Sequence, residues 1–107
     1  MDTKHRGAHS ELVACAWLLR RGYEVFRNVS QHGLIDLIAM KDGKTLFIDV
    51  KTASRHIKYG YLFAPLSNTQ LMAGIVPLYV LDDGDCLLGV QLQTQIKYYK
   101  IMEARHV

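Results

Sequence analysis

Residues 34–51 read LIDLIAMKDGKTLFIDVK, and the architecture of the chain can be built outward from this stretch. Two short apolar runs, residues 34–40 and 45–51, flank the turn sequence KDGK. An Asp-Gly pair at the centre of such a turn is a strong signal for a type I′ β-hairpin, because both central residues of that turn need a positive φ angle. The stretch therefore predicts a two-stranded hairpin with one carboxylate on each strand.

The two carboxylates of this hairpin belong to Asp36 and Asp49. With Asp42 and Gly43 as the turn residues, counting outward along both strands places Asp36 opposite Asp49. Side chains alternate along a strand, so Lys51 is predicted to share the face of Asp49. Like charges directly opposite each other destabilise a sheet, and a divalent cation held by oxygen ligands compensates them. Alternatively, this is an ordinary solvent-facing strand on which Lys51 only neutralises Asp49.

The opposite face of the hairpin is wholly apolar and is predicted to lie against the core. Its members are Ile35, Leu37, Ala39, Leu46, Ile48 and Val50. On the polar face, the two aspartates and the lysine are flanked by Leu34, Ile38, Met40 and Phe47.

The other segments complete a pattern typical of an α+β fold. A helix is expected from about residue 7 to residue 21, because Ala8, Leu12, Cys15 and Leu19 recur at helical spacing and Gly22 can cap the end. The remaining predictions are a strand at residues 23–29, a basic loop at 53–60, a short strand at 61–63, a short helix opened by residues 67–70 and ended by Gly74, and a second hairpin of residues 76–81 and 86–92. This order predicts one α+β domain over residues 1–107.

Composition limits the class of protein. Half of the residues are hydrophobic, the formal net charge is +3 and the pI is about 9.0, which permits a nucleic-acid partner. No apolar run approaches the ~20 residues that span a bilayer. Cys15 and Cys86 are far apart and lack a CxxC neighbour, which predicts free thiols in a reducing compartment. A soluble cytoplasmic protein is therefore expected.

Glu11 is a third candidate acid, on the predicted N-terminal helix. A glutamate in a first turn capped by Ser10 would stabilise the helix dipole. The alternative is that this helix covers an edge of the sheet and directs Glu11 toward Asp36 and Asp49.

Four motifs in this order resemble the PD-(D/E)XK nuclease superfamily, over about residues 7–52. They are Gly7-x3-Glu11, residues 18–25, Asp36-Leu37-Ile38-Ala39 and Ile48-Asp49-Val50-Lys51-Thr52. The resemblance is closest to small Holliday junction resolvases and related short site-specific endonucleases. It implies a restriction-endonuclease-like fold, in which helices flank a mixed central β-sheet.

The resemblance also implies a chemistry. Glu11, Asp36, Asp49 and the carbonyl of Val50 would bind Mg²⁺, for which Mn²⁺ would substitute, and Lys51 would assist the attacking water. Such a site hydrolyses phosphodiester bonds, because it activates water and neutralises developing charge. The expected function is a Mg²⁺-dependent DNA endonuclease with Holliday junction resolvase-like structure specificity. The candidate DNA contacts are Arg6, Arg27, Ser30, Gln31, Lys41, Lys44, Arg55, His56 and Lys58.

Two other functions remain open from the sequence. The chain can be a catalytically silent nucleic-acid-binding module, or a module that binds a partner protein through its apolar second half. A homodimer or higher homo-oligomer is expected of a nuclease, because one active site per chain cannot make the two cuts that a duplex or junction requires. Residues 78–81 and 87–90 are the predicted interface, since exposed apolar strands invite pairing.

Overall fold

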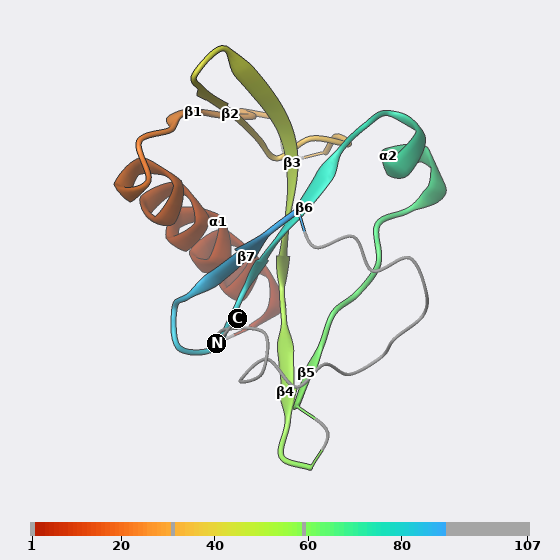
Figure 1. The fold of residues 1–107 in the computed structure, drawn as a ribbon. Coiled ribbons are helices and arrows are strands. Elements are labelled where there is room, and N and C mark those ends of the chain that lie inside the picture. Colours follow the sequence, from red (N-terminus) through yellow and green to blue (C-terminus); the bar gives the residue numbers. More distant parts are fainter. Residues whose placement is uncertain (1, 31, 59, 90–107) are drawn as a thin grey trace.

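The structure is a computed structural model that describes residues 2–30, 32–58 and 60–89 (Figure 1). The elements, in chain order, are α1 (Thr3–Arg20), β1 (Glu24–Arg27), β2 (Leu37–Lys41), β3 (Lys44–Thr52), β4 (Ser54–His56), β5 (Gly60–Leu62), α2 (Asn68–Met72), β6 (Val76–Val80) and β7 (Cys86–Leu88). None of the described helices is long and apolar enough to cross a membrane. The predicted strand at 86–92 lies outside the described residues from residue 90 onward, and a single domain over residues 1–107 stays a prediction.

A mixed sheet forms the centre of the molecule. Its strand order is β1-β2-β3-β6-β7, and β3 and β6 run parallel while the other neighbours are antiparallel. The helix α1 lies along one face and contacts β1, β3 and β6. The strands β4 and β5 form a separate ribbon at the end of β3 that is remote from the β2–β3 turn (Figure 1). This arrangement confirms the α+β prediction of a mixed sheet flanked by helices.

The sheet buries apolar side chains on both faces. On the α1 face, the buried residues are Ala14, Leu18, Leu37, Ala39, Ile48, Leu78, Val80 and Cys86. On the other face, near β4 and β5, they are Ala53, Tyr61, Phe63, Tyr79 and Leu81. The strand β6 lies inside the sheet between β3 and β7, and it is buried on both sides because its successive side chains point to opposite faces, each of which is covered. The predicted interface at residues 78–81 is therefore wrong, since these side chains are already buried within the chain.

The β2–β3 hairpin has the predicted turn and register. Asp42 and Gly43 have φ angles of 52° and 76°, and Lys41 pairs with Lys44. The pairing continues to Leu37 opposite Ile48. The predicted core residues Leu37, Ala39 and Ile48 are fully buried.

The helix α1 is longer than predicted and buries a different face. It begins at Thr3, because the side chain of Asp2 accepts a hydrogen bond from the backbone nitrogen of His5 at 2.9 Å. It ends as predicted, with Gly22 in the left-handed region at a φ of 85°. The buried residues are Ser10, Ala14 and Leu18. The predicted apolar face was wrong in Leu12 and Leu19, which are exposed.

A hydrogen bond of Ser10 accounts for the difference between the predicted and the observed buried face of α1. Its hydroxyl lies 2.6 Å from the hydroxyl of Thr52, so a buried polar group on α1 is satisfied by a strand 42 positions away. Ser10 is therefore an interior residue of α1 and does not cap it. A polar residue on the buried face of a helix is invisible to a search for apolar periodicity.

The second half contains one further correction and one confirmation. Residues 54–56, predicted as loop, form β4, because they pair with Gly60–Leu62. The helix α2 forms where predicted, with a reciprocal cap between Ser67 and Gln70, and Gly74 follows it with a φ of 74°.

Candidate active site

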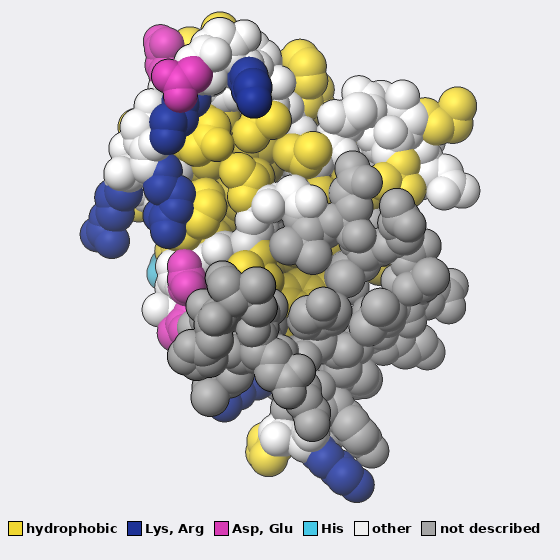
Figure 2. All heavy atoms as spheres, in the orientation of Figure 1, with side chains coloured by type: hydrophobic (Ala, Val, Ile, Leu, Met, Phe, Trp, Pro, Cys, Tyr) yellow, Lys and Arg dark blue, Asp and Glu magenta, His cyan; other side chains and the backbone are white. Residues whose placement is uncertain are grey.

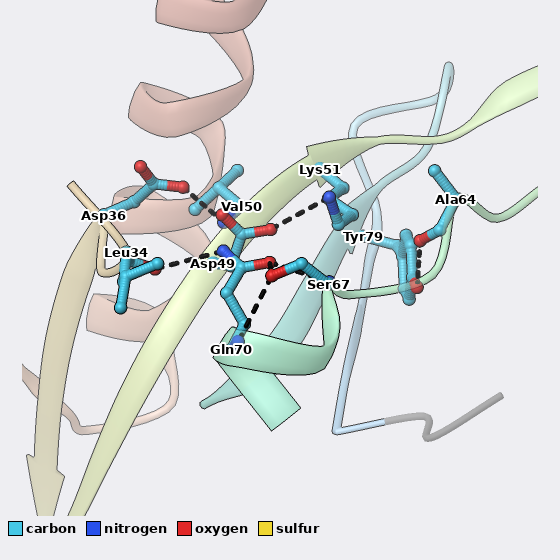
Figure 3. A network of polar contacts seen from close by, with 9 residues as sticks. All are labelled: Leu34, Asp36, Asp49, Val50, Lys51, Ala64, Ser67, Gln70 and Tyr79. Atoms are coloured by element: carbon cyan, nitrogen blue, oxygen red, sulfur yellow. Dashed lines mark hydrogen bonds and ion pairs between the residues drawn. The ribbon is translucent and has the colours of Figure 1, made fainter. Parts of the chain in front are cut away.

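Asp36 lies where β2 and β3 part. Its backbone nitrogen donates to the carbonyl of Ile48 at 2.8 Å, so the regular pairing ends one residue before Asp49 is reached. Its carboxylate Oδ2 then accepts a hydrogen bond from the backbone nitrogen of Val50 at 2.7 Å (Figure 3). The side chain of Asp36 thus takes the place of a main-chain partner for β3, and this fixes its carboxylate beside Asp49.

Asn28, which follows β1, holds the other side of the segment that carries Asp36. Its backbone nitrogen donates to the carbonyl of Asp36 at 2.9 Å, and its side-chain nitrogen donates to the carbonyl of Ile35 at 2.8 Å. These two bonds continue the contact between β1 and β2 after the regular strands have ended. The segment that carries Asp36 is therefore held on both sides by side-chain hydrogen bonds.

Asp49 and Lys51 form an ion pair on the face of β3 that points away from α1. Lys51 Nζ lies 3.1 Å from Asp49 Oδ2, and the two side chains are 24% and 14% exposed. This contact is a charge pair without hydrogen-bond geometry, and Oδ2 is buried with no hydrogen-bond donor among the described residues. A buried carboxylate oxygen without a hydrogen-bond donor is unusual in a folded protein, so Oδ2 is a candidate cation ligand.

The electrostatics of the site are those of crowded carboxylates. Burial, with smaller contributions from the neighbouring carboxylates of Asp49 and Glu11, raises the pKa of the Asp36 carboxyl to about 6, against the lowering effect of the Val50 hydrogen bond. The ionised form of Asp36 is therefore disfavoured unless positive charge is supplied.

This shift predicts a pH dependence of stability in chelator. The pKa of Asp36 rises from 3.8 in the unfolded chain to about 6 in the folded protein, so the folded protein binds the proton more tightly. Its contribution to stability is fully present below pH ~4 and is lost as the pH rises through ~6. Urea unfolding at pH 5 and pH 8 should show this loss in the wild type but not in Asp36→Asn. Equal pH dependence of the two proteins would mean that folding does not raise the pKa of Asp36.

Glu11 is near the aspartates but is held by another partner. Its Oε1 forms an ion pair with Arg27 Nε at 3.0 Å. Within residues 2–30, 32–58 and 60–89, no three carboxylate, histidine or cysteine side chains lie close enough to hold a metal ion by themselves. The structure therefore brings together Asp36, Asp49 and Lys51, and places Glu11 at the margin.

Gln70 of α2 contacts the segment that leads into the site. Its Nε2 donates to the carbonyl of Leu34 at 3.1 Å, and its Oε1 accepts from the backbone nitrogen of Ser67 at 3.1 Å (Figure 3). It therefore ties α2 to the segment that leads into Asp36. The sequence signals only its capping role, since its second contact is 36 positions away.

The candidate DNA contacts are distributed unevenly. Several of these cations contact other parts of the protein: Arg27 binds Glu11, Arg55 binds Asp82 at 3.4 Å, and Lys41 donates to the carbonyl of Arg21 at 2.5 Å. The side chains of Arg6, Ser30, Lys44 and Lys58 are exposed. Gln31 lies outside the described residues, and His56 is described only as part of the β4 backbone.

A cavity of about 390 Å³ brings together Arg6 and Arg55, which are remote in sequence. Other residues that line it are His9, Ser10, Thr52 and Asp82. It lies where the parallel strands β3 and β6 end, beside the first turns of α1.

Comparisons with known proteins identify a family, relatives and a similar fold. The model of a family described as PD-(D/E)XK endonuclease matches residues 1–99. A UPF0102 protein of Helicobacter hepaticus is 37% identical over 70 residues, which are 64% of this chain and 57% of that protein. A UPF0102 protein of Rhizobium etli is 42% identical over 53 residues, 48% of this chain and 42% of that protein. The chain thus spans about half the length of the curated relatives it matches.

One solved structure has a similar fold. It is that of the bacterial homing endonuclease I-Ssp6803I, with a TM-score of 0.65 over 99% of this chain and 92% of that chain. The sequence identity is 16%, so the likeness concerns the fold. It confirms the restriction-endonuclease-like architecture that the motifs implied.

Proposed function

Because the chain belongs to the PD-(D/E)XK endonuclease family, we propose that it is a metal-dependent endonuclease that hydrolyses phosphodiester bonds in DNA. One observation carries this proposal. Two carboxylates, Asp36 and Asp49, converge where β2 and β3 part, and the ammonium of Lys51 lies 3.1 Å from a carboxylate oxygen that has no hydrogen-bond donor among the described residues.

Asp36 and Asp49 fit a hard divalent cation. Two neighbouring carboxylates need positive charge, as the raised pKa of Asp36 indicates, and the Oδ2 of Asp49, which has no hydrogen-bond donor among the described residues, is an available oxygen ligand. We assign these two side chains and the carbonyl of Val50 as the ligands of Mg²⁺, with Mn²⁺ as a substitute. Few protein ligands suffice, because Mg²⁺ usually keeps several waters. When bound, the ion supplies a Lewis acid that polarises the phosphate and acidifies water.

The other residues act through their own contacts. Lys51 is positioned to donate a hydrogen bond to the attacking water or to a phosphate oxygen, since its ammonium is partly exposed beside Asp49. Val50 orients the carboxylate of Asp36 through its backbone nitrogen. Glu11 reaches the site through water in this proposal, because Arg27 occupies its Oε1.

A cleavage assay on a panel of substrates tests the proposal. The panel contains linear duplex, single-stranded, flap and four-way junction DNA, each incubated with Mg²⁺, with Mn²⁺ or with chelator. We expect cleavage of at least one substrate in metal and none in chelator, and preference for the junction would support resolvase-like specificity. Binding without cleavage by the folded protein would identify a silent nucleic-acid-binding module, and neither would favour a partner-protein module.

Salt dependence separates the cations that contact DNA from those with protein partners. Lys44→Ala should weaken binding and reduce the slope of log affinity against log salt by about 1, as the loss of one phosphate contact requires. Lys41 is the matched control, because it faces Lys44 across the turn but donates to the carbonyl of Arg21. Fluorescence anisotropy at several salt concentrations measures both slopes. Equal slopes in wild type and Lys44→Ala would exclude Lys44 from the DNA interface.

Two cuts in a duplex require two active sites, so we propose that the chain acts as a homodimer or higher homo-oligomer. The interface lies outside residues 78–81, which are buried in the chain's own core. Sedimentation equilibrium at the concentrations of the cleavage assay tests this, and a monomer that cuts both strands would contradict it.

The cysteines support a cytoplasmic location in this proposal. Cys15 and Cys86 are free thiols, and burial raises the pKa of Cys86 to about 12 and also raises that of Cys15. Such thiols are protonated and unreactive, and they suit a compartment in which disulfides are rare.

A further inference from the structure

Three apolar side chains form a row across three neighbouring strands of the sheet. Phe26 of β1 pairs with Ile38 of β2, which pairs with Phe47 of β3. Phe26 is 45% exposed and Phe47 is 39% exposed, and Met40 and Leu34 beside them are also exposed. Hydrophobic side chains are seen around the β2–β3 hairpin and α2 in the upper half of Figure 2. We call Phe26, Ile38 and Phe47 the apolar row.

The apolar row lies on the same face of the sheet as the candidate catalytic residues. Along β3, Phe47, Asp49 and Lys51 alternate with residues that point toward α1, of which Ile48 is fully buried. Two residues along a strand span roughly 7 Å, so Phe47 is a direct neighbour of Asp49. The apolar row therefore borders the site rather than lying on a remote surface.

The position of the apolar row beside the site indicates which molecule binds to it. A nucleotide next to a phosphate that reaches Asp49 and Lys51 lies within reach of Phe47, because Phe47 and Asp49 are roughly 7 Å apart along β3. A protein partner seated on the apolar row would cover the approach to the same two residues. The occupant compatible with cleavage is thus the nucleic acid itself.

The uncharged side chains of the apolar row indicate that it contacts bases and not phosphates. Its three side chains carry no charge, whereas the outside of a duplex presents phosphates that need cations or hydrogen-bond donors. Exposed aromatic rings instead stack on bases that are unpaired, or enter between base steps that have opened. Paired bases inside a continuous helix do not offer such a face.

We propose that the apolar row stacks against an unpaired base next to the scissile phosphate, and that the substrates are DNA forms with unpaired or unstacked nucleotides rather than continuous duplex. This inference rests on the proposed nuclease function and adds the class of substrate to it. Phe26 and Phe47 are the residues that determine specificity, and Ile38 packs between them.

Binding measurements with the Lys51→Ala protein test the inference without cleavage. The probes are a flap and a duplex of the same sequence, each with one fluorescent adenine analogue whose emission falls on stacking. We expect quenching with the flap, where the analogue is unpaired, and none with the duplex. Adding Phe47→Ala or Phe26→Ala should abolish the quenching and weaken flap binding by about tenfold, with little effect on duplex binding.

Two control variants make the result specific. Phe47→Leu keeps an apolar side chain but removes the ring, so it should lose the quenching as Phe47→Ala does. Leu19→Ala changes a side chain that is 60% exposed on α1, and it should leave quenching and affinity unchanged. Thermal melts confirm that each variant is folded.

Three outcomes would overturn the inference. They are equal quenching by wild-type Phe47 and by Phe47→Leu, equal losses of flap and duplex binding in the alanine variants, and dissociation of an oligomer by Phe47→Ala in sedimentation, which would make the apolar row a contact between copies. None of these touches the nuclease proposal, which fails separately if the wild type cuts no DNA in metal.

Discussion

Lys51→Ala is expected to slow metal-dependent DNA cleavage by about 10²–10⁴-fold, the usual contribution of a positioned acid or base. The ammonium of Lys51 lies 3.1 Å from Asp49 Oδ2, where it can act on water or on the phosphate as charge develops. An interaction made mainly in the transition state lowers the rate without weakening the ground-state complex. DNA affinity should therefore change by no more than about twofold. Single-turnover cleavage and anisotropy titrations measure the two quantities.

Lys44→Ala is the matched control for this prediction. Lys44 is an exposed lysine at the other end of β3, so its loss should reduce affinity while leaving the rate at saturating DNA nearly unchanged. A loss of rate in Lys51→Ala together with a loss of affinity in Lys44→Ala would show that Lys51 acts on the reacting atoms. Unchanged turnover in Lys51→Ala would remove it from the mechanism.

Asp36→Asn is expected to abolish cleavage and to remove the stabilisation of the fold by Mg²⁺. Asparagine retains an oxygen that can accept the hydrogen bond of Val50, but it removes the negative charge. A ligand that binds only the folded state stabilises it by about 2.7 kcal/mol at a hundred times its Kd. Thermal melts with Mg²⁺ and with chelator should therefore show a Mg²⁺-dependent rise in the Tm of the wild type and almost none in Asp36→Asn.

The melts in chelator also compare the stability of Asp36→Asn and the wild type without metal. Without metal, Asp36→Asn should be at least as stable as the wild type, by ~0.2–1 kcal/mol, because two crowded carboxylates become one. Asp36→Ala is the control, since it leaves the backbone nitrogen of Val50 without this acceptor and should cost ~1–3 kcal/mol. If Asp36→Asn instead melts well below the wild type in chelator, Asp36 is a structural acceptor and the assignment of a metal site is wrong.

The parts of the fold that could be predicted are those with local signals. Asp42 and Gly43 specify a turn whose φ angles are both positive, and the turn sets the register of the hairpin as far as Leu37 opposite Ile48. The reciprocal cap of Ser67 and Gln70 marks the start of α2 within four residues. In each case the residues that determine the structure lie close together in the chain.

The candidate site was predictable only in part for the same reason. Asp49 and Lys51 share a face because they are two residues apart on one strand, which side-chain alternation alone decides. The prediction that Asp36 lies opposite Asp49 extended the register of the β2–β3 hairpin beyond Leu37. In the structure the regular pairing stops at Leu37, and the Asp36 carboxylate bonds the backbone of Val50.

From its sequence alone, this protein was determined to be an α+β chain with a hairpin that carries Asp49 and Lys51 on one face, because turn geometry and strand alternation are properties of neighbouring residues. Only the tertiary structure decided that Ser10 turns into the core to meet Thr52, that Arg27 holds Glu11, and that β6 pairs in parallel with β3. These contacts join residues that are 16 to 42 positions apart, or whole strands. Their formation depends on how α1 and the strands pack together, which no local pattern encodes.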